Sequence, residues 1–219
     1  MTFDCSRREV IAACLELAGK GYLPGTGGNV ALRIDHEHFA ITPSAMDYYA
    51  MTSDDVCVLR LKDLVQTAGD RRPSIEHKLH ARVFRFRHDC RASIHTHQPI
   101  ASAYTLLGRD LRVTLPAHQV LLGTKAVSVG YAPSGTGWLA SKLARSLRPE
   151  VNAYLLRNHG VVCCGSTLTE TLTRLETLES ACSSFFRAAI TGRPGSGWNL
   201  YMAEVLTLLM KREERESPR

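Results

Sequence analysis

The sequence has no apolar run of the roughly 20 residues that a membrane-spanning helix needs. Its longest apolar stretch near the C-terminus, residues 200–210, contains Glu204 and is better explained as a packed helix. Residues 1–8 lack the apolar segment of a secretory signal peptide. We therefore expect a cytoplasmic protein with no membrane partner.

Paired cysteine motifs are also missing. The chain has seven cysteines, an odd number, and none has the C-x-x-C spacing of a redox or zinc motif. This pattern suits a reducing compartment, where thiols serve as small hydrophobic side chains. A disulfide framework is therefore not expected.

The remaining composition is that of an ordinary globular protein. Apolar residues make up 44% and charged residues 22% of 219 residues, which excludes a fibre or a disordered chain. We found no internal repeat and no low-complexity segment. We therefore expect one domain, residues 1–219, with a mobile tail at about residues 211–219.

Positive charge exceeds negative charge, because 27 Lys and Arg residues stand against 21 Asp and Glu residues. The densest basic cluster lies on a predicted helix that also carries Val83, Phe84 and Phe86, so we interpret it as a solvated helix face. That cluster consists of Arg82, Arg85, Arg87, His88 and Arg91. We expect no nucleic-acid partner, and a small phosphorylated substrate would use some of the positive potential.

Hydrophobic periodicity and turn residues predict helices and strands in mixed order. The predicted helices cover residues 6–20, 73–87, 99–107, 138–147 and 168–190. The predicted strands cover residues 30–34, 39–41, 56–59, 91–96, 127–129, 153–156 and 161–164. Capping boxes at Ser6 and Thr167 mark two of the helix starts, and Ser74 is the predicted N-cap of a third.

Several of these strands follow one another too closely for helical crossovers. Such spacing requires antiparallel pairs, whereas the helices need a sheet face to cover. The predicted fold class is α/β, with a mostly antiparallel central sheet between helices.

His95 and His97 lie two residues apart on a predicted strand. Side chains alternate between the faces of a strand, so both imidazoles project to the same side and can meet one ion. Two solvent-facing histidines would show the same spacing, and a metal site requires a third ligand.

His159 is the best candidate for that ligand, because it lies in an Asn-His-Gly turn between two apolar strands. The alternative is a histidine that merely closes a hairpin. Three neutral imidazoles would leave a metal its double charge and an open position, which is typical of a catalytic site.

Glu76 lies near the start of a predicted helix, where the helix dipole favours an anion. It is a candidate general acid/base, and a surface ion pair with Arg72 is the alternative. His80, one turn later, is either a hydrogen-bonding support or a core residue, and the sequence does not separate these two roles.

Five ordered motifs bring these residues together and give a resemblance to a known family. They are Gly25-Thr26-Gly27-Gly28-Asn29, Ile41-Thr42-Pro43-Ser44, Pro73-Ser74-Ile75-Glu76, His95-Thr96-His97 and Asn158-His159-Gly160. Over about residues 7–190 they resemble the class II aldolase/adducin family.

The resemblance implies a zinc-dependent aldolase that cleaves a ketose 1-phosphate into dihydroxyacetone phosphate and an aldehyde. It implies a homotetramer, zinc held by His95, His97 and His159 with Mn²⁺, Co²⁺ or Fe²⁺ as alternatives, and Glu76 as the acid/base. The residues that match the family's phosphate-binding pattern are Thr26, Gly28, Asn29, Ser44 and Ser74.

Three positions depart from the aldolase pattern. Ile75 replaces a hydroxyl residue, so one phosphate contact is lost or replaced. Ser44-Ala45 replaces Thr-Gly, and the following Met46-Asp47-Tyr48 resembles ribulose-5-phosphate 4-epimerases. A tyrosine of the family aligns loosely with Gln119, beside His118, which could substitute for it.

These departures leave several functions open. An epimerase of the family would carry aspartate where this chain has Glu76, so the glutamate favours an aldolase. A sugar-phosphate dehydratase or decarboxylase would retain the same ligands. An adducin-like interaction module would lack the histidines, and a hydrolase would use zinc-bound water without any ketose.

Overall fold

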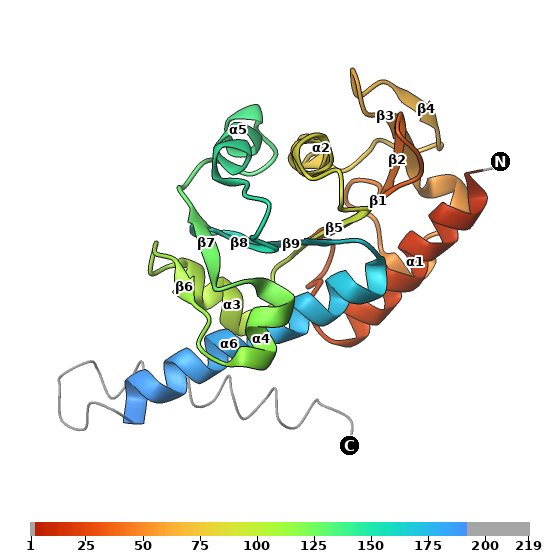
Figure 1. Cartoon of the computed structure of the whole chain (residues 1–219). Coiled ribbons are helices and arrows are strands. Elements are labelled where there is room, and N and C mark those ends of the chain that lie inside the picture. Colours follow the sequence, from red (N-terminus) through yellow and green to blue (C-terminus); the bar gives the residue numbers. More distant parts are fainter. Residues whose placement is uncertain (1–2, 192–219) are drawn as a thin grey trace.

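The computed structural model describes residues 3–191, which form one nine-stranded sheet with helices on both faces (Figure 1). The strand order is β4-β3-β2-β1-β5-β9-β8-β7-β6. Among the described strands, only β7 and β8 pair in parallel. The predicted α/β class with a mostly antiparallel sheet is confirmed.

The elements have the following bounds. The strands are β1 Asn29–Arg33, β2 His38–Ile41, β3 Cys57–Arg60, β4 Gln66–Ala68, β5 Ala92–Thr96, β6 Leu111–Arg112, β7 Lys125–Val129, β8 Ala153–Leu156 and β9 Gly160–Gly165. The helices are α1 Asp4–Gly19, α2 His77–Phe86, α3 Pro99–Thr105, α4 Pro116–Leu122, α5 Gly137–Ser146 and α6 Leu168–Thr191. Two short 3₁₀ helices, Tyr48–Ala50 and Ser53–Asp55, precede β3.

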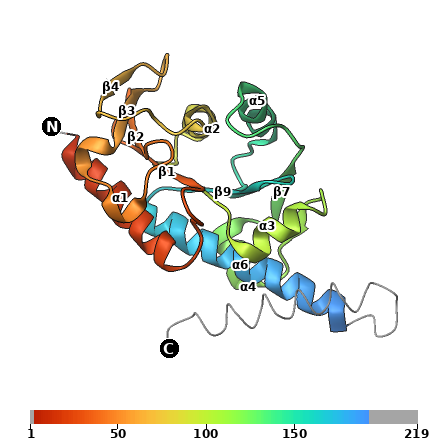
Figure 2. The same cartoon turned by 180° about the vertical axis from the view of Figure 1, so that it is seen from behind.

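The helices divide between the two faces of the sheet. Helices α1, α3, α4 and α6 cover one face, and α2 and α5 lie side by side on the other (Figures 1 and 2). The larger hydrophobic core joins the first group of helices to residues such as Val30, Ile94 and Cys163. Alternate strand residues point to opposite faces, so the neighbouring Asn29, Ser93 and His95 lie on the α2 and α5 side.

The sheet order brings distant segments to one end of the central strands. The start of β1 pairs with the end of β5 through Asn29 and His95. The start of β9 pairs with the same end of β5 through Val161 and Thr96. The turn between β8 and β9 therefore lies beside the residue that follows β5.

Two predicted helix starts are wrong. α1 begins at Asp4, before the proposed cap at Ser6, and Phe3 occupies the N-cap position without a side-chain hydrogen bond. α2 begins at His77 with Glu76 as N-cap residue, so Ser74 does not cap it. The backbone of Ser74 donates instead to the carbonyl of Thr42, because residues 73–74 lie extended against residues 42–44.

The third predicted helix start, at Thr167, agrees with the structure in position. α6 begins at Leu168, and the hydroxyl of Thr167 accepts a hydrogen bond from the backbone of Glu170. The Glu170 carboxylate reaches back to the amide of Ser166 rather than to that of Thr167. The sequence missed β4, β6 and α4, three short elements with weak periodicity.

The basic cluster is not wholly a solvated face. Arg87 is buried, with its guanidinium donating to the carbonyl of Val151 and pairing with Asp89. This arginine ties α2 to the segment before β8, so it has a structural role.

No helix within residues 3–191 is both long and apolar enough to cross a membrane. The expected mobile tail at residues 211–219 and the predicted packed helix at residues 200–210 lie outside the described residues.

Candidate active site and metal centre

His95 lies at the end of β5 and is fully buried. Its Nδ1 donates a hydrogen bond to the carbonyl of Val161 on β9, at 2.9 Å. This bond places the proton of a neutral ring on Nδ1 and leaves the lone pair on Nε2. Burial lowers the pKa of His95, so the neutral form that can bind a metal is favoured.

His97 follows β5 directly, where the chain leaves the sheet and enters α3. Its backbone amide donates to the carbonyl of Tyr22, and the buried Gln98 donates to the carbonyl of Leu175 on α6. The buried Glu179 accepts two backbone hydrogen bonds from the first turn of α3. These contacts fix the backbone of His97 and of the segment that follows it.

His159 lies in the turn between β8 and β9, after Asn158, whose φ of 56° places it in the left-handed region. Gly160 follows and allows close packing. A Cβ at this glycine would clash with the carbonyl of Thr96 and would lie 2.6 Å from Cδ2 of His97. The glycine is therefore required for the turn to approach the end of β5.

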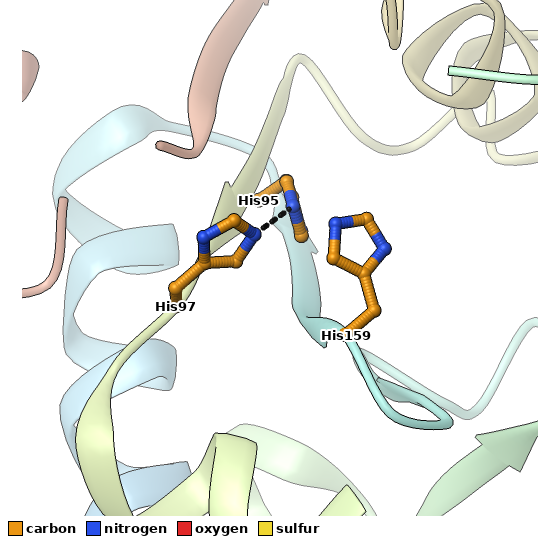
Figure 3. A group of neighbouring side chains, drawn as sticks. All are labelled: His95, His97 and His159. Carbon is orange, nitrogen blue, oxygen red and sulfur yellow. Dashed lines mark hydrogen bonds between the residues drawn. The ribbon is translucent and has the colours of Figure 1, made fainter. Parts of the chain in front are cut away.

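The three imidazoles converge (Figure 3). The Nε2 atoms of His95 and His97 are 2.9 Å apart, and the ring centroid of His159 is 4.7 Å from that of His95 and 5.1 Å from that of His97. One nitrogen from each ring lies within 4.8 Å of the others. The structure thus brings together the three histidines that the sequence singled out.

The donor set fits a divalent metal. Three imidazole nitrogens and a nearby carboxylate are all electron-pair donors, and bringing them together is unfavourable without a cation between them. The His159 nitrogen that faces Glu76 is Nε2, so this atom completes the set of donors at the site.

Glu76 stands beside the histidines and is 6% exposed. Its Oε2 lies 3.2 Å from Nε2 of His95, and its Oε1 lies 3.5 Å from Nε2 of His159. The surface ion pair with Arg72 that the sequence left open is not formed, since the carboxylate faces the buried site.

Two hydrogen bonds orient the Glu76 carboxylate. The amide of Asn29 donates to Oε2, and the hydroxyl of Ser134 donates to Oε1, each at 2.9 Å. Burial alone would raise the pKa of Glu76, but His95 beside it and these two donors leave the pKa below its usual range. Glu76 is therefore ionised at neutral pH.

Ser134 was missed by the sequence analysis. It belongs to the loop between β7 and α5, far along the chain from Glu76, and only the packing of α5 against α2 brings it close. The glycine-rich residues 135–137 beside it were the only available signal. That pattern predicts a turn, but it does not show which residue the side chain of Ser134 contacts.

The residues proposed for phosphate binding lie on three adjoining segments. Pro43 and Pro73 form an antiparallel bridge, and the amide of Ser44 donates to the carbonyl of Arg72. The hydroxyl of Thr42 accepts a hydrogen bond from the amide of Val30, which joins the third segment. The loop before β1, the residues after β2 and the residues before Glu76 therefore lie side by side.

The five individual residues have different surroundings. Thr26 is exposed and Ser44 is partly exposed, whereas Ser74 is buried and its hydroxyl accepts from the amide of Glu76. Gly28 has a φ of 82°, and a Cβ there would lie 2.7 Å from the carbonyl of His95. Asn29 differs from the others, because its buried amide bonds to Glu76.

Tyr48 supports the glycine loop and was not assigned a role from the sequence. Its buried hydroxyl lies 2.8 Å from the carbonyl oxygen of Gly28 and 3.2 Å from that of Gly27. The tyrosine therefore holds the backbone next to the candidate phosphate site.

The remaining departures from the aldolase pattern have clear positions. Ile75 is 58% exposed and packs against Gly135, next to Ser134 near the end of the loop between β7 and α5. Gln119 lies on α4 and donates from its side chain to the carbonyl of Val113. His118, next to it, is partly exposed.

The chain is similar in sequence and in fold to known proteins. A 5-deoxy-D-ribulose 1-phosphate aldolase from Bacillus thuringiensis serovar kurstaki is 30% identical over 198 residues, covering 89% of this chain and 90% of that protein. A methylthioribulose-1-phosphate dehydratase from Yersinia pestis is 29% identical over 190 residues, covering 82% and 85%. The solved structure of an L-fuculose 1-phosphate aldolase superposes with a TM-score of 0.81 at 25% identity, covering 98% of each chain.

The family described as Class II Aldolase and Adducin N-terminal domain matches residues 8–186, most of the chain. The chain therefore belongs to the class II aldolase and adducin family.

Proposed function

We propose that this protein is a zinc-dependent aldolase that reversibly cleaves a ketose 1-phosphate into dihydroxyacetone phosphate and an aldehyde. The observation that carries the proposal is the convergence of three imidazoles with the buried carboxylate of Glu76 beside them. This arrangement combines a site for a Lewis acid with a group that can transfer a proton.

His95, His97 and His159 would hold the metal through one ring nitrogen each. A bound divalent ion stabilises the negative charge that develops on the substrate oxygens when a bond next to a carbonyl breaks. Neutral imidazoles leave the full charge of the ion available, and the Val161 carbonyl keeps the ring of His95 in the required tautomer.

Glu76 would transfer the proton at the reacting carbon. During cleavage the carbon–carbon bond breaks, the hydroxyl group next to that bond loses its proton as the aldehyde forms and leaves, and the carbon of the dihydroxyacetone phosphate fragment takes up a proton. Asn29 and Ser134 hold the carboxylate in one orientation, so a proton that it has taken up is delivered in one direction.

The phosphate would bind at the three adjoining segments. Thr26, Ser44 and Ser74 supply hydroxyls, and backbone N–H groups around Gly28 add donors of the kind that bind anions. Asn29 belongs to the same region, but its side chain donates a hydrogen bond to Glu76. Its side chain would therefore orient the Glu76 carboxylate. Exposed Ile75 would leave the phosphate one hydroxyl fewer.

The proposal extends to the assembly and the metal. We propose a cytoplasmic homotetramer of single-domain chains, with zinc as the metal and Mn²⁺, Co²⁺ or Fe²⁺ as alternatives. The partner is a small phosphorylated sugar, with neither a membrane nor a nucleic acid involved.

A dehydratase is the second candidate, supported by the similarity to methylthioribulose-1-phosphate dehydratase. The two reactions need the same ligands and the same kind of carboxylate. They differ in the group that leaves, which is an aldehyde in one case and water in the other. An interaction module of the adducin type is disfavoured, because all three histidines are present and converge.

The test is a coupled assay for dihydroxyacetone phosphate release, run on a panel of ketose 1-phosphates with the zinc-loaded protein. 5-Deoxyribulose 1-phosphate and fuculose 1-phosphate belong in the panel, as does methylthioribulose 1-phosphate, for which loss of water is followed separately. Release from at least one ketose supports the aldolase, and dehydration without release supports the second candidate. Elemental analysis of the native protein checks the metal, and a metal-free protein would revive the interaction module.

A further inference from the structure

A continuous chain of buried hydrogen bonds leads from the middle of the sheet to the Glu76 carboxylate. His80 of α2 is completely buried, and its Nδ1 lies 2.7 Å from the hydroxyl of Ser93 on β5. Its Nε2 lies 2.5 Å from Oδ1 of Asn29 at the start of β1. The amide nitrogen of Asn29 then donates to Oε2 of Glu76.

The direction of every bond in this chain is determined. A carboxylate can only accept, so the NH₂ group of Asn29 faces Glu76 and its oxygen faces His80. That oxygen also only accepts, so the proton of His80 lies on Nε2. The Nδ1 atom is then an acceptor and takes the hydroxyl proton of Ser93.

The state of His80 is consistent with this direction. Burial, with a smaller contribution from His95, lowers the pKa of His80 to about 3 although Glu76 acts in the opposite sense. The ring is neutral at pH 7 and carries a single proton. One proton is what the geometry between Ser93 and Asn29 requires.

We infer that His80 is a positioning residue that fixes the amide of Asn29, and through it the carboxylate of Glu76, with Ser93 as the terminal donor. This inference rests on the proposed role of Glu76 in proton transfer. It also decides between the support role and the core role that the sequence left open for His80.

Removal of the imidazole would free the amide of Asn29. An amide can rotate by half a turn with little change in shape, which would present its oxygen to the carboxylate. The oxygen of Asn29 and Oε2 of Glu76, both acceptors, would then face each other. The Glu76 carboxylate would therefore move away from its present position. An apolar side chain of similar volume at position 80 would fill the core without preventing this rotation.

The first experiment compares His80→Leu with wild type, measuring kcat, KM and bound zinc. We expect kcat to fall by about 10- to 100-fold, as for other residues that orient a ligand or base, with KM within about twofold and zinc content unchanged. His80→Gln, whose amide can donate to Asn29, should recover most of kcat. Thr105→Val is the matched control, because its buried hydroxyl bonds only within α3.

A double-mutant cycle separates positioning from general destabilisation. In a Glu76→Gln background, His80→Leu should reduce the residual kcat by less than about twofold. Equal losses in both backgrounds would overturn the inference, and so would an unchanged kcat in the single variant.

A crystal structure of the zinc-loaded His80→Leu protein gives a readout that does not depend on activity. The inference requires the Asn29 amide to leave Glu76 and the carboxylate to change position, and an unchanged Glu76 would overturn it. If wild type cleaves and dehydrates no sugar phosphate, the proposed function fails while this crystallographic test still decides the positioning role. Should His80→Leu not fold, Ser93→Ala removes the terminal donor and is subjected to the same structural test.

Discussion

The two sides of the candidate site are built differently. On the metal side, His95 and Glu76 are buried and held by hydrogen bonds from neighbouring segments, whereas His97 and His159 are half-buried. The phosphate side includes Thr26 and Ser44, which are exposed or partly exposed at the ends of loops. The core therefore fixes His95 and Glu76, whereas the phosphate side, apart from the buried Asn29 and Ser74, is partly open to solvent.

Under the proposed function, this difference separates two tasks. Groups that stabilise charge and move a proton act best when their orientation is set before the substrate arrives. Groups that recognise a phosphate need to be accessible, and hydroxyls and backbone amides at loop ends supply that access. Substitutions on the metal side should therefore affect kcat, and those on the phosphate side should affect KM.

The largest effect is expected from His97→Ala. Two imidazoles hold a divalent metal far more weakly than three, so we expect both bound zinc and activity to be lost. Elemental analysis and the coupled assay measure these two quantities. His36→Ala is the matched control, because the side chain of His36 is 90% exposed and distant in sequence from the three candidate ligands. Full zinc content in His97→Ala would remove this residue from the ligand set.

The second-largest effect is expected from Glu76→Gln, which tests whether proton transfer can be removed without loss of the metal. Glu76→Gln keeps the shape of the side chain and the hydrogen bond to Ser134 or Asn29, but it cannot exchange a proton. We expect unchanged zinc content and a kcat about 10²- to 10⁴-fold lower. Full activity in this variant would exclude Glu76 as the acid/base, and loss of zinc would assign it to the ligand set instead.

Gly160→Ala tests the packing that brings the turn to the strand. The added Cβ would lie 2.6 Å from His97 and 3.0 Å from His95, besides its clash with Thr96. Because displacement of a reacting group by about 1 Å can cost on the order of 100-fold, we expect a comparable loss of kcat with weaker zinc binding. Activity and zinc titration measure the two effects.

Gly19→Ala is the control for this substitution, since a Cβ at Gly19 meets nothing within 4 Å. It should retain wild-type activity and zinc binding. Equal behaviour of the two glycine variants would mean that the approach of the turn does not set the metal geometry.

The metal side was also the part of the site that the sequence predicted best. His95 and His97 follow from the two-residue period of a strand, although β5 ends at Thr96 and His97 lies just beyond it. His159 follows from its position in a turn between apolar strands. These signals are local, and the sheet order then places the three residues together.

Local sequence patterns could not predict the contacts that support the site. Ser74 has the sequence context of a helix cap, but the bridge between Pro43 and Pro73 holds it extended, and this pairing joins segments about 30 residues apart. Ser134 reaches Glu76 only through the packing of α5 on α2. Local periodicity carries no information about which helix faces which.

The smallest effect is expected on the phosphate side, from Ser44→Ala. Loss of one neutral hydroxyl that donates to a charged group typically costs about 1.5–3 kcal/mol, and other donors at an exposed site recover part of it. We therefore expect KM for the ketose 1-phosphate to rise by about tenfold, with kcat and zinc content close to wild type. Ser141→Ala on α5 is the matched control, because its hydroxyl bonds only to the carbonyl of Gly137 in the same helix. A fall in kcat without a change in KM would contradict the division between the two sides, since a residue of the phosphate side would then contribute to the chemical step.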